Sequence, residues 1–123
     1  MTTANNTLFE SELPGLKLLN RGKVRDIYEV DEDHLLIITT DRLSAFDVVL
    51  PQPIPGKGEV LTRVSNFWFD RTRSLVPNHL SDRPLNTVVP DAEQRAALGD
   101  RALVVRRLKP LPVEAIVRGY LIG

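Results

Sequence analysis

Two basic side chains lie close to a glycine in the sequence R-G-K-V-R-D at residues 21–26. If this segment is an extended strand, Lys23 and Arg25 share one face, because side chains alternate along a strand. Gly22 lets the backbone approach a ligand closely, Lys23 offers a point charge and Arg25 offers a planar fork of donors. The combination suits a site for phosphate oxygens, but basic residues also alternate on exposed strands for solubility alone, and without further context this alternative carries more weight.

A loop with one hydroxyl and two carboxylates follows the β-branched run at residues 35–40. Asp41, Ser44 and Asp47 would be held there at a sheet edge by a rigid strand, which suits them to grip a small polar ligand. The same residue types cap turns, so a purely local role is an equal alternative. Ser44 lacks the surroundings of a hydrolase nucleophile, because no G-x-S-x-G pattern contains it.

Lys57 lies in a proline- and glycine-rich segment just before a predicted helix. Free backbone N–H groups and the helix dipole favour an anion at such a position. The segment is not a Walker A loop, and Glu59 in the first turn could satisfy the dipole instead. Lys57 is therefore a candidate binding residue with a structural alternative.

A second candidate for anion binding lies near the end of the chain. Residues 113–118 alternate between apolar and polar types, which places Glu114 and Arg118 on one face of a predicted strand. Arg118 precedes a glycine, and this combination suits two-point recognition of a phosphate or carboxylate. A surface ion pair between Glu114 and Arg118 is the alternative.

The composition argues against several classes of protein. No cysteine is present, which removes disulfides, thiolate metal sites and cysteine nucleophiles. Sixteen basic residues balance sixteen acidic ones, so no net charge would attract the chain to nucleic acid or to an anionic membrane. The polar N-terminus and the short apolar runs match neither a signal peptide nor a membrane span. We therefore expect a soluble, cytoplasmic protein that binds neither nucleic acid nor a membrane.

We expect the helices and strands that position these residues to form an α+β domain with a mainly antiparallel sheet and flanking helices. Residues 1–15 are expected to be an N-terminal leader, and residues 16–123 to be one domain. The first two strands should pair as an antiparallel hairpin. Strands are expected at residues 16–30, 35–40, 102–108 and 113–118, and helices from about residue 59 until Pro77 and at residues 92–98.

Each predicted helix carries a distinct signal. In the long helix, apolar residues such as Val60, Val64, Phe67 and Trp68 recur at helical spacing, so we expect this face in the core rather than as a platform for stacked bases. The short helix has Asp91 at its N-cap position and Gly99 at its end.

Five motifs, taken together and in this order, closely resemble the SAICAR synthetase family: R-G-K-V-R-D-I-Y, D-R-L-S-A-F-D, P-G-K-G-E-V-L-T, S-N-F-W-F and L-P-V-E-A-I-V-R-G-Y. The resemblance covers nearly all of residues 16–123. It implies an ATP-dependent ligase of purine biosynthesis that joins L-aspartate to carboxyaminoimidazole ribonucleotide (CAIR) and releases SAICAR, ADP and phosphate. The family mechanism it implies is phosphoryl transfer to the CAIR carboxylate followed by attack of the aspartate amine.

The resemblance also implies roles for individual residues. Gly22, Lys23, Val24 and Arg25 resemble a loop over the ATP phosphates. Arg106, Arg107, Leu108 and Lys109 resemble a hinge whose backbone meets adenine, with Val24, Leu36 and Leu108 as walls around the base. On the CAIR side, the residues implied are Ser44, Asp47, Lys57 and Arg118, with Glu114 near either ligand.

The family pattern would continue beyond Gly123, so we expect this chain to be the N-terminal lobe of an ATP-grasp-like enzyme. The Mg²⁺ ligands should then lie outside the segment, and the 123 residues alone should be inactive. A non-enzymatic nucleotide-binding module is the alternative, and a nucleic-acid-binding domain is disfavoured by the balanced charge. The sequence leaves the oligomeric state open.

Overall fold

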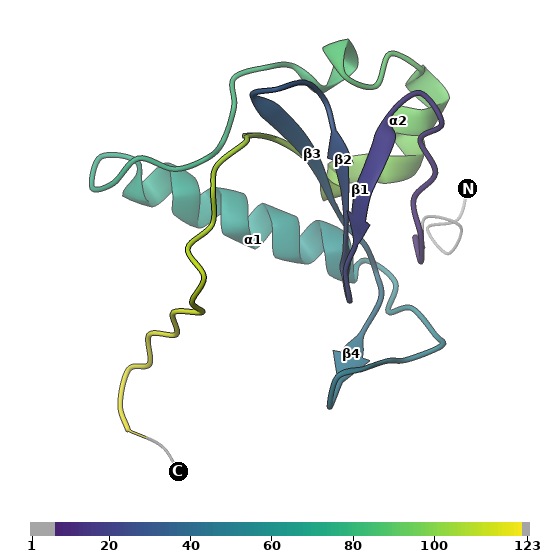
Figure 1. Ribbon diagram of the computed structural model, residues 1–123. Coiled ribbons are helices and arrows are strands. Elements are labelled where there is room, and N and C mark those ends of the chain that lie inside the picture. Colours follow the sequence, from purple (N-terminus) through teal and green to yellow (C-terminus); the bar gives the residue numbers. More distant parts are fainter. Residues whose placement is uncertain (1–6, 122–123) are drawn as a thin grey trace.

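The computed structural model describes residues 7–121 and shows a four-stranded sheet with two helices (Figure 1). In chain order, the strands are β1 (Lys17–Arg21), β2 (Arg25–Glu29), β3 (His34–Thr39), β4 (Ser44–Ala45), β5 (Val48–Val49) and β6 (Ala102–Arg106). The helices are α1 (Lys57–Thr72) and α2 (Ala92–Leu98), with short 3₁₀ turns η2 (Leu85–Thr87) and η3 (Gly99–Arg101). This is the predicted α+β class with an antiparallel sheet.

The main sheet has the strand order β1-β2-β3-β6, and every neighbouring pair is antiparallel. The predicted strand at residues 16–30 is in fact two strands, because the Gly22 amide donates to the Arg25 carbonyl at 2.8 Å and closes a turn between them. Lys23 and Val24 therefore lie in a loop, and strand alternation does not set their directions. The predicted hairpin with the strand at residues 35–40 is confirmed as the β2–β3 pair.

One face of the sheet forms the hydrophobic core. Tyr28, Leu36, Ile38 and Val104 alternate along their strands and pack with apolar residues from the N-terminal segment, η2 and α2; these are Leu13, Val88, Val89 and Leu98. Each such side chain contributes roughly 1.5–3 kcal/mol when it is removed from water. Leu36 is fully buried here, on the face away from α1, so the expectation that it walls a bound base is wrong.

Helix α1 begins at Lys57 after Gly56, whose φ of 80° is left-handed. It ends at Thr72, several residues before Pro77, where the Leu75 amide already bonds to the Thr72 carbonyl in a tighter turn. The buried positions of α1 are Gly58 and Thr62, so this face packs against the sheet.

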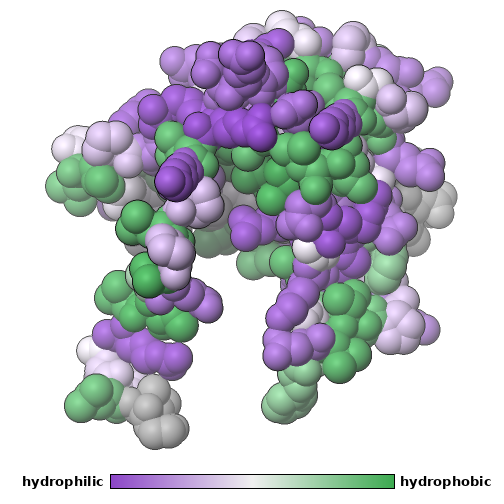
Figure 2. Space-filling model, in the orientation of Figure 1, coloured by the Kyte–Doolittle hydropathy of each residue, from purple (hydrophilic) through white to green (hydrophobic). Residues whose placement is uncertain are grey.

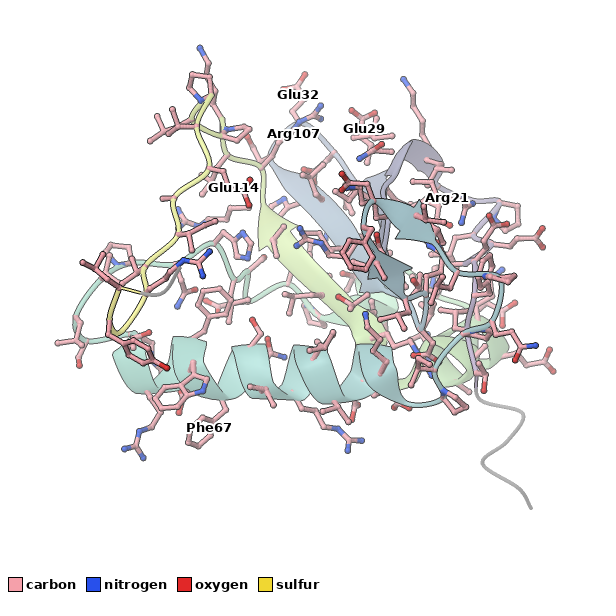
Figure 3. All side chains as sticks on the ribbon, turned by 90° about the horizontal axis from the view of Figure 1, so that it is seen from below. Arg21, Glu29, Glu32, Phe67, Arg107 and Glu114 are labelled. Carbon is pink, nitrogen blue, oxygen red and sulfur yellow. The ribbon has the colours of Figure 1, made fainter. Side chains whose placement is uncertain are left out.

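The predicted core face of α1 is the wrong face. Val60, Val64, Phe67 and Trp68 are each about half exposed, and Figure 3 shows Phe67 pointing away from the sheet. The helix lies close to the backbone of β3, where Gly58 fits and a bulky side chain would not. Close approach of the backbones, rather than hydrophobicity, therefore selects the inward face.

Helix α2 is confirmed at its predicted bounds. The Asp91 carboxylate accepts from the Glu93 amide at 2.8 Å and from the Gln94 amide at 3.3 Å, and Gly99 follows with a φ of 59°. Both signals are local, so they could be read from the sequence.

The segment after β6 has no regular secondary structure. The predicted strand at residues 113–118 is wrong: Val113, Ile116 and Val117 are exposed, and the segment runs away from the sheet (Figure 1). A strand needs a partner for its hydrogen bonds, and no strand of residues 7–106 pairs with this segment. Figure 2 shows hydrophobic groups along it, interspersed with polar ones.

Candidate functional site

The loop at residues 22–24 lies between β1 and β2 and is anchored from one side. The Val24 carbonyl accepts from the Thr40 amide at 2.9 Å and from the Thr40 hydroxyl at 2.7 Å. The Gly22 and Lys23 carbonyls accept from the guanidinium of Arg42 at 2.9 and 3.1 Å. Within residues 7–121, the amides of Lys23 and Val24 have no hydrogen-bond acceptor. These amides remain available to a ligand.

The Lys23 side chain reaches the tip of the small β4–β5 hairpin, where its ammonium group forms an ion pair with Asp47. Phe46 and Asp47 both adopt left-handed φ values, of 50° and 63°, as a tight two-residue hairpin turn requires. Both partners are largely exposed, and the hydrogen bond and charge of Lys23 hold the pKa of Asp47 below its usual value. Two residues predicted for different ligands are thus brought together.

A cavity of about 360 Å³ lies between the sheet and α1. Of the predicted site residues, Val24 and Arg25 line it. Its other lining residues, which the sequence did not single out, are Ile37, Thr39, Leu61, Thr62, Ser65, Phe69, His79 and Leu103. The cavity therefore combines apolar walls with hydroxyl groups and a basic end, and its volume suits a small organic ligand.

His79 lies in a positively charged region, near Arg25 and Arg106. Burial lowers the pKa of His79, and the nearby charges of Arg25 and Arg106 lower it further. The ring also lies 5.4 Å from that of Phe69, centre to centre. An incoming anion would relieve this accumulation of positive charge.

Asp41 is a structural residue, in line with its alternative assignment. Its buried carboxylate accepts from the Arg101 guanidinium at 2.9 Å, the Leu8 amide at 2.9 Å and the Gly58 amide at 2.8 Å. Burial alone would raise the pKa of Asp41, but these hydrogen bonds hold it below the usual value. Asp41 thereby ties the N-terminal segment and the start of α1 to the end of β3.

Ser44 and Lys57 are the other residues predicted to bind a ligand near this loop. Ser44 pairs with Val49 in the small hairpin and is partly buried. Lys57 is the first residue of α1, and its amide donates to the Ile54 carbonyl at 3.1 Å. Two of the N-terminal amides expected to hold an anion, those of Lys57 and Gly58, are therefore already occupied.

The predicted hinge residues 106–109 leave the sheet at the end of β6. Arg106 donates through its side chain to the Asn78 carbonyl, and its amide donates to the His79 carbonyl at 2.7 Å. Arg107 forms an ion pair with Glu29 at 2.7 Å, the two side chains lying near each other in Figure 3. Leu108 and Lys109 are exposed.

Glu114 and Arg118 are exposed, and neither lines the cavity beside α1. No ion pair joins them within residues 7–121, so the surface pair considered from the sequence does not form. The structure does not bring either residue to the cavity beside α1.

The described part of the chain holds no group of three or more histidine, cysteine, aspartate or glutamate side chains that could bind a metal ion. In the same range, no helix has the length and apolar character needed to cross a membrane.

Comparison with known proteins decides the family. A family described as SAICAR synthetase matches residues 18–123. The chain belongs to the SAICAR synthetase family. It is 67% identical over 121 residues to the phosphoribosylaminoimidazole-succinocarboxamide synthase of Methylococcus capsulatus, covering 98% of this chain and 41% of that relative. It is 61% identical over 120 residues to the enzyme of the same name from Nitrosomonas europaea, covering 98% and 40%.

Solved structures of the family share this fold. A SAICAR synthase is 43% identical with a TM-score of 0.87, and a SAICAR synthase from Saccharomyces cerevisiae in complex with SAICAR is 44% identical with a TM-score of 0.86. Each match covers 95% of this chain and 42% of the other. A type-2 SAICAR synthetase in complex with ADP, 21% identical with a TM-score of 0.57, shows likeness of fold alone. The chain thus spans about two fifths of the length of the relatives it matches.

Proposed function

We propose that this chain is the nucleotide-binding part of an ATP-dependent carbon–nitrogen ligase of de novo purine biosynthesis. The reaction joins L-aspartate to the carboxylate of CAIR and yields SAICAR, ADP and phosphate. Membership of the SAICAR synthetase family supports the reaction. The basic loop at residues 22–24, next to a partly apolar cavity, is the observation that supports nucleotide binding by this part.

The proposed ATP site combines the loop at residues 22–24 with the cavity beside α1. Lys23, Arg25 and the free amides of the loop face the phosphates, because cations and N–H donors together neutralise phosphate oxygens. Val24 and other apolar residues of the cavity pack on the base, and the backbone of residues 106–109 supplies the hinge. The sheet then covers the nucleotide, as in the N-terminal lobe of an ATP-grasp-like enzyme.

The proposed CAIR site comprises Ser44, Asp47, Lys57, Glu114 and Arg118. The ion pair between Lys23 and Asp47 supports placing the two ligands side by side, because it joins the phosphate loop to the hairpin that carries Asp47. Glu114 and Arg118 would reach this site only when the segment at residues 107–121 packs against the domain instead of following its exposed path.

The proposed chemistry proceeds in two balanced steps. The CAIR carboxylate oxygen attacks the γ-phosphorus of ATP, the bond to the β-phosphate oxygen breaks, and ADP leaves. The aspartate amine then attacks the acyl phosphate, loses a proton and expels phosphate as the amide forms. Binding and charge neutralisation by Lys23 and Arg25 would assist the first step.

Mg²⁺ is the metal expected for phosphoryl transfer from ATP. The described residues hold no group of three or more possible metal ligands, and the chain spans about two fifths of its relatives' length. We therefore place the Mg²⁺ ligands, the aspartate site and closure of the active site in other parts of a longer, cytoplasmic enzyme, and we propose that residues 1–123 alone do not turn over.

Lys23→Ala in the full-length protein tests this assignment, with Lys17→Ala as the matched control on the same hairpin. Loss of one charge-assisted contact costs about 1.5–3 kcal/mol, which corresponds to a roughly 10- to 150-fold lower kcat/KM for ATP. SAICAR and ADP are measured by chromatography, with omission of each substrate in turn. ATP binding without SAICAR formation by the wild-type protein would favour a non-enzymatic nucleotide-binding module, and equal kinetics of the two variants would refute the role of Lys23.

A further inference from the structure

Arg42 is a buried arginine that contacts the loop at residues 22–24 from behind. Its side chain is 3% exposed. Nε donates to the Lys23 carbonyl at 3.1 Å, and Nη2 donates to the Gly22 carbonyl at 2.9 Å. Nη1 donates to the Phe9 carbonyl at 2.6 Å. One planar guanidinium thus holds two consecutive carbonyls of the loop at once, which only a fork of donors can do.

A buried aspartate holds Arg42 in place. Asp26 is fully buried, and its Oδ1 accepts from Arg42 Nη2 at 2.8 Å. Its Oδ2 accepts from Arg21 Nη1 at 2.7 Å, from the Ser11 amide at 2.9 Å and from the Ser11 hydroxyl at 2.7 Å. Both carboxylate oxygens of Asp26 are therefore held by hydrogen bonds, and Arg42 cannot shift without breaking its own bond to this carboxylate.

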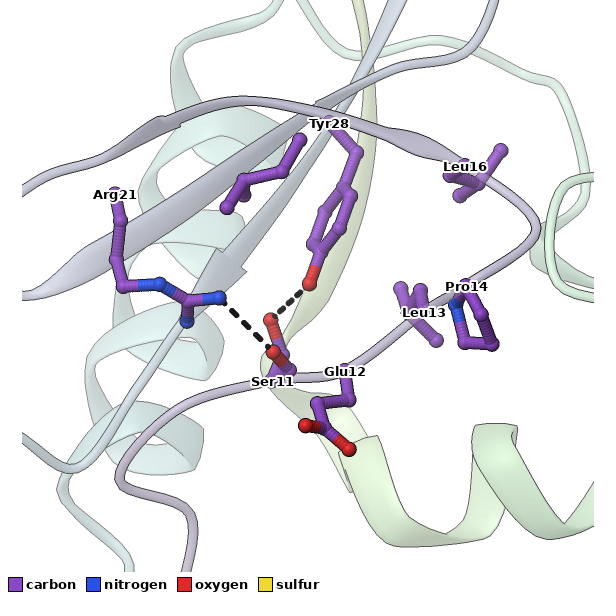
Figure 4. Close-up of a pocket in the computed structure, with 8 residues that line it drawn as sticks. Ser11, Glu12, Leu13, Pro14, Leu16, Arg21 and Tyr28 are labelled. Atoms are coloured by element: carbon purple, nitrogen blue, oxygen red, sulfur yellow. Dashed lines mark hydrogen bonds between the residues drawn. The ribbon is translucent and has the colours of Figure 1, made fainter.

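The support extends to the opposite side of Asp26. The Ser11 hydroxyl lies 2.7 Å from the Tyr28 hydroxyl, and Arg21 Nη2 donates to the Ser11 carbonyl at 3.3 Å (Figure 4). These residues line a separate cavity of about 380 Å³, which lies next to the N-terminal segment. The connection from Tyr28 through Ser11 and Asp26 to Arg42 is continuous.

The contacts of Arg42 set the direction of the loop amides. In a trans peptide the carbonyl and the following N–H point in opposite directions, and no peptide bond of the described residues is cis. The carbonyls of Gly22 and Lys23 point to Arg42, so the amides of Lys23 and Val24 point away from it. Those are the two amides that lack an acceptor in the part of the chain that the structure describes.

Energetics also favour a positioning role for the Asp26–Arg42 pair. Burying two charges is expensive, and apolar residues of similar volume often replace a buried ion pair without loss of stability. A buried ion pair therefore contributes little to stability by itself. It does fix the orientation of the groups to which it is hydrogen-bonded. The pair here fixes the backbone of a loop rather than packing between two core elements.

We propose that Arg42, held by Asp26, is a positioning residue that presents the Lys23 and Val24 amides to the phosphates of the nucleotide. This proposal rests on the proposed function and deepens it. Arg42 itself touches neither ligand, because it lies on the inner side of the loop.

Arg42→Lys in the full-length protein tests the proposal, because lysine keeps the charge but cannot bind both carbonyls in one plane. We expect the KM for ATP to rise about tenfold with the KM for aspartate unchanged, and the rise in Tm on adding ADP to shrink. Arg63→Lys is the matched control: Arg63 also binds through two guanidinium nitrogens, to Asp100 at 2.6 and 2.5 Å, but lies on the exposed side of α1.

The possible outcomes separate this proposal from the proposed function. If wild-type protein binds ATP and Lys23→Ala weakens that binding, but Arg42→Lys behaves as Arg63→Lys does, the positioning role is refuted while the site stands. If wild-type protein binds no ATP, the proposed function fails with it. If Arg42→Lys does not fold, hydrogen exchange of the wild-type protein decides: added ADP should slow exchange at the Lys23 and Val24 amides, and unchanged exchange there would overturn the proposal.

Discussion

Charged side chains of this domain fall into two groups at the scale of single residues. Arg42 and Arg101 are buried and each is paired with a buried aspartate, so their charges hold loops and termini together. Lys23 has a largely exposed ammonium group instead, held by an exposed carboxylate at the surface. Such an exposed pair contributes little to stability, so a phosphate can replace the carboxylate at small cost.

Only part of the candidate site could be predicted from the sequence. The R-G-K-V-R-D pattern suggested a phosphate site on the face of a strand, whereas residues 22–24 form a loop between β1 and β2, and Val24 and Arg25 line a cavity. The cavity residues His79 and Phe69 were missed because they come from a turn and from a helix face that no local pattern marks. Arg42 resembled any other loop arginine in the sequence, since the partners of its guanidinium lie 16 to 33 residues away along the chain.

At the residue scale, we predict that the pKa of His79 is below 6.5 in the folded protein and that it rises when ADP binds. Burial, Arg25 and Arg106 all favour the neutral ring, and phosphate oxygens would favour the protonated one. Because the folded-state pKa is lowered, the stability that His79 contributes is present above the unfolded-state pKa and is lost as pH falls through the folded-state value.

An NMR titration of the His79 ring in the full-length protein measures this pKa directly. His79→Gln assigns the signal by its loss. A free-protein pKa at or above 6.5, or one that does not change with saturating ADP, would contradict the described surroundings of the ring.

Helices and strands were predictable where their signals are local. Helix α2 has its cap and its closing glycine within a few residues of each other, and both were read correctly. The inward face of α1 and the strand expected at residues 113–118 were wrong, because each depends on a partner. Apolar spacing marks a face that could be buried, but only the position of the sheet decides which face packs on it.

At the element scale, we predict that Gly58→Ala destabilises the domain. An added Cβ would lie 2.1 Å from the Thr39 carbonyl oxygen and 2.9 Å from that of Thr40, and both are backbone atoms that cannot move aside easily. We expect the free energy of unfolding to fall by about 1–3 kcal/mol, as it does in overpacked cores. Alanine is otherwise the better helix former by about 1 kcal/mol, so the sign of the change is informative.

Urea denaturation of the full-length protein measures the effect through the midpoint of the transition that involves α1. Gly15→Ala is the control, since an added Cβ there meets no atom within 4 Å. Unchanged or increased stability of Gly58→Ala would show that α1 does not approach β3 as closely as described.

The whole molecule presents apolar groups that the described residues leave uncovered. Phe67 and Trp68 on α1, with Val117 and Tyr120 in the C-terminal segment, are exposed, and the chain spans about two fifths of its relatives' length. We propose that other parts of a longer enzyme cover these groups and bring Glu114 and Arg118 to the CAIR site. This placement could not be predicted from 123 residues, because the contacts that would direct it are not among them.

We propose above all that residues 22–25 of this chain bind the phosphates of ATP. A crystal structure of the full-length protein with an unreactive ATP analogue tests it most directly. We predict that phosphate oxygens lie within about 2.7–3.2 Å of the Lys23 and Val24 amides and of the Lys23 ammonium group, with Asp47 released from its ion pair. A nucleotide bound at another place, with the Lys23–Asp47 pair intact and the loop amides free, would contradict the account.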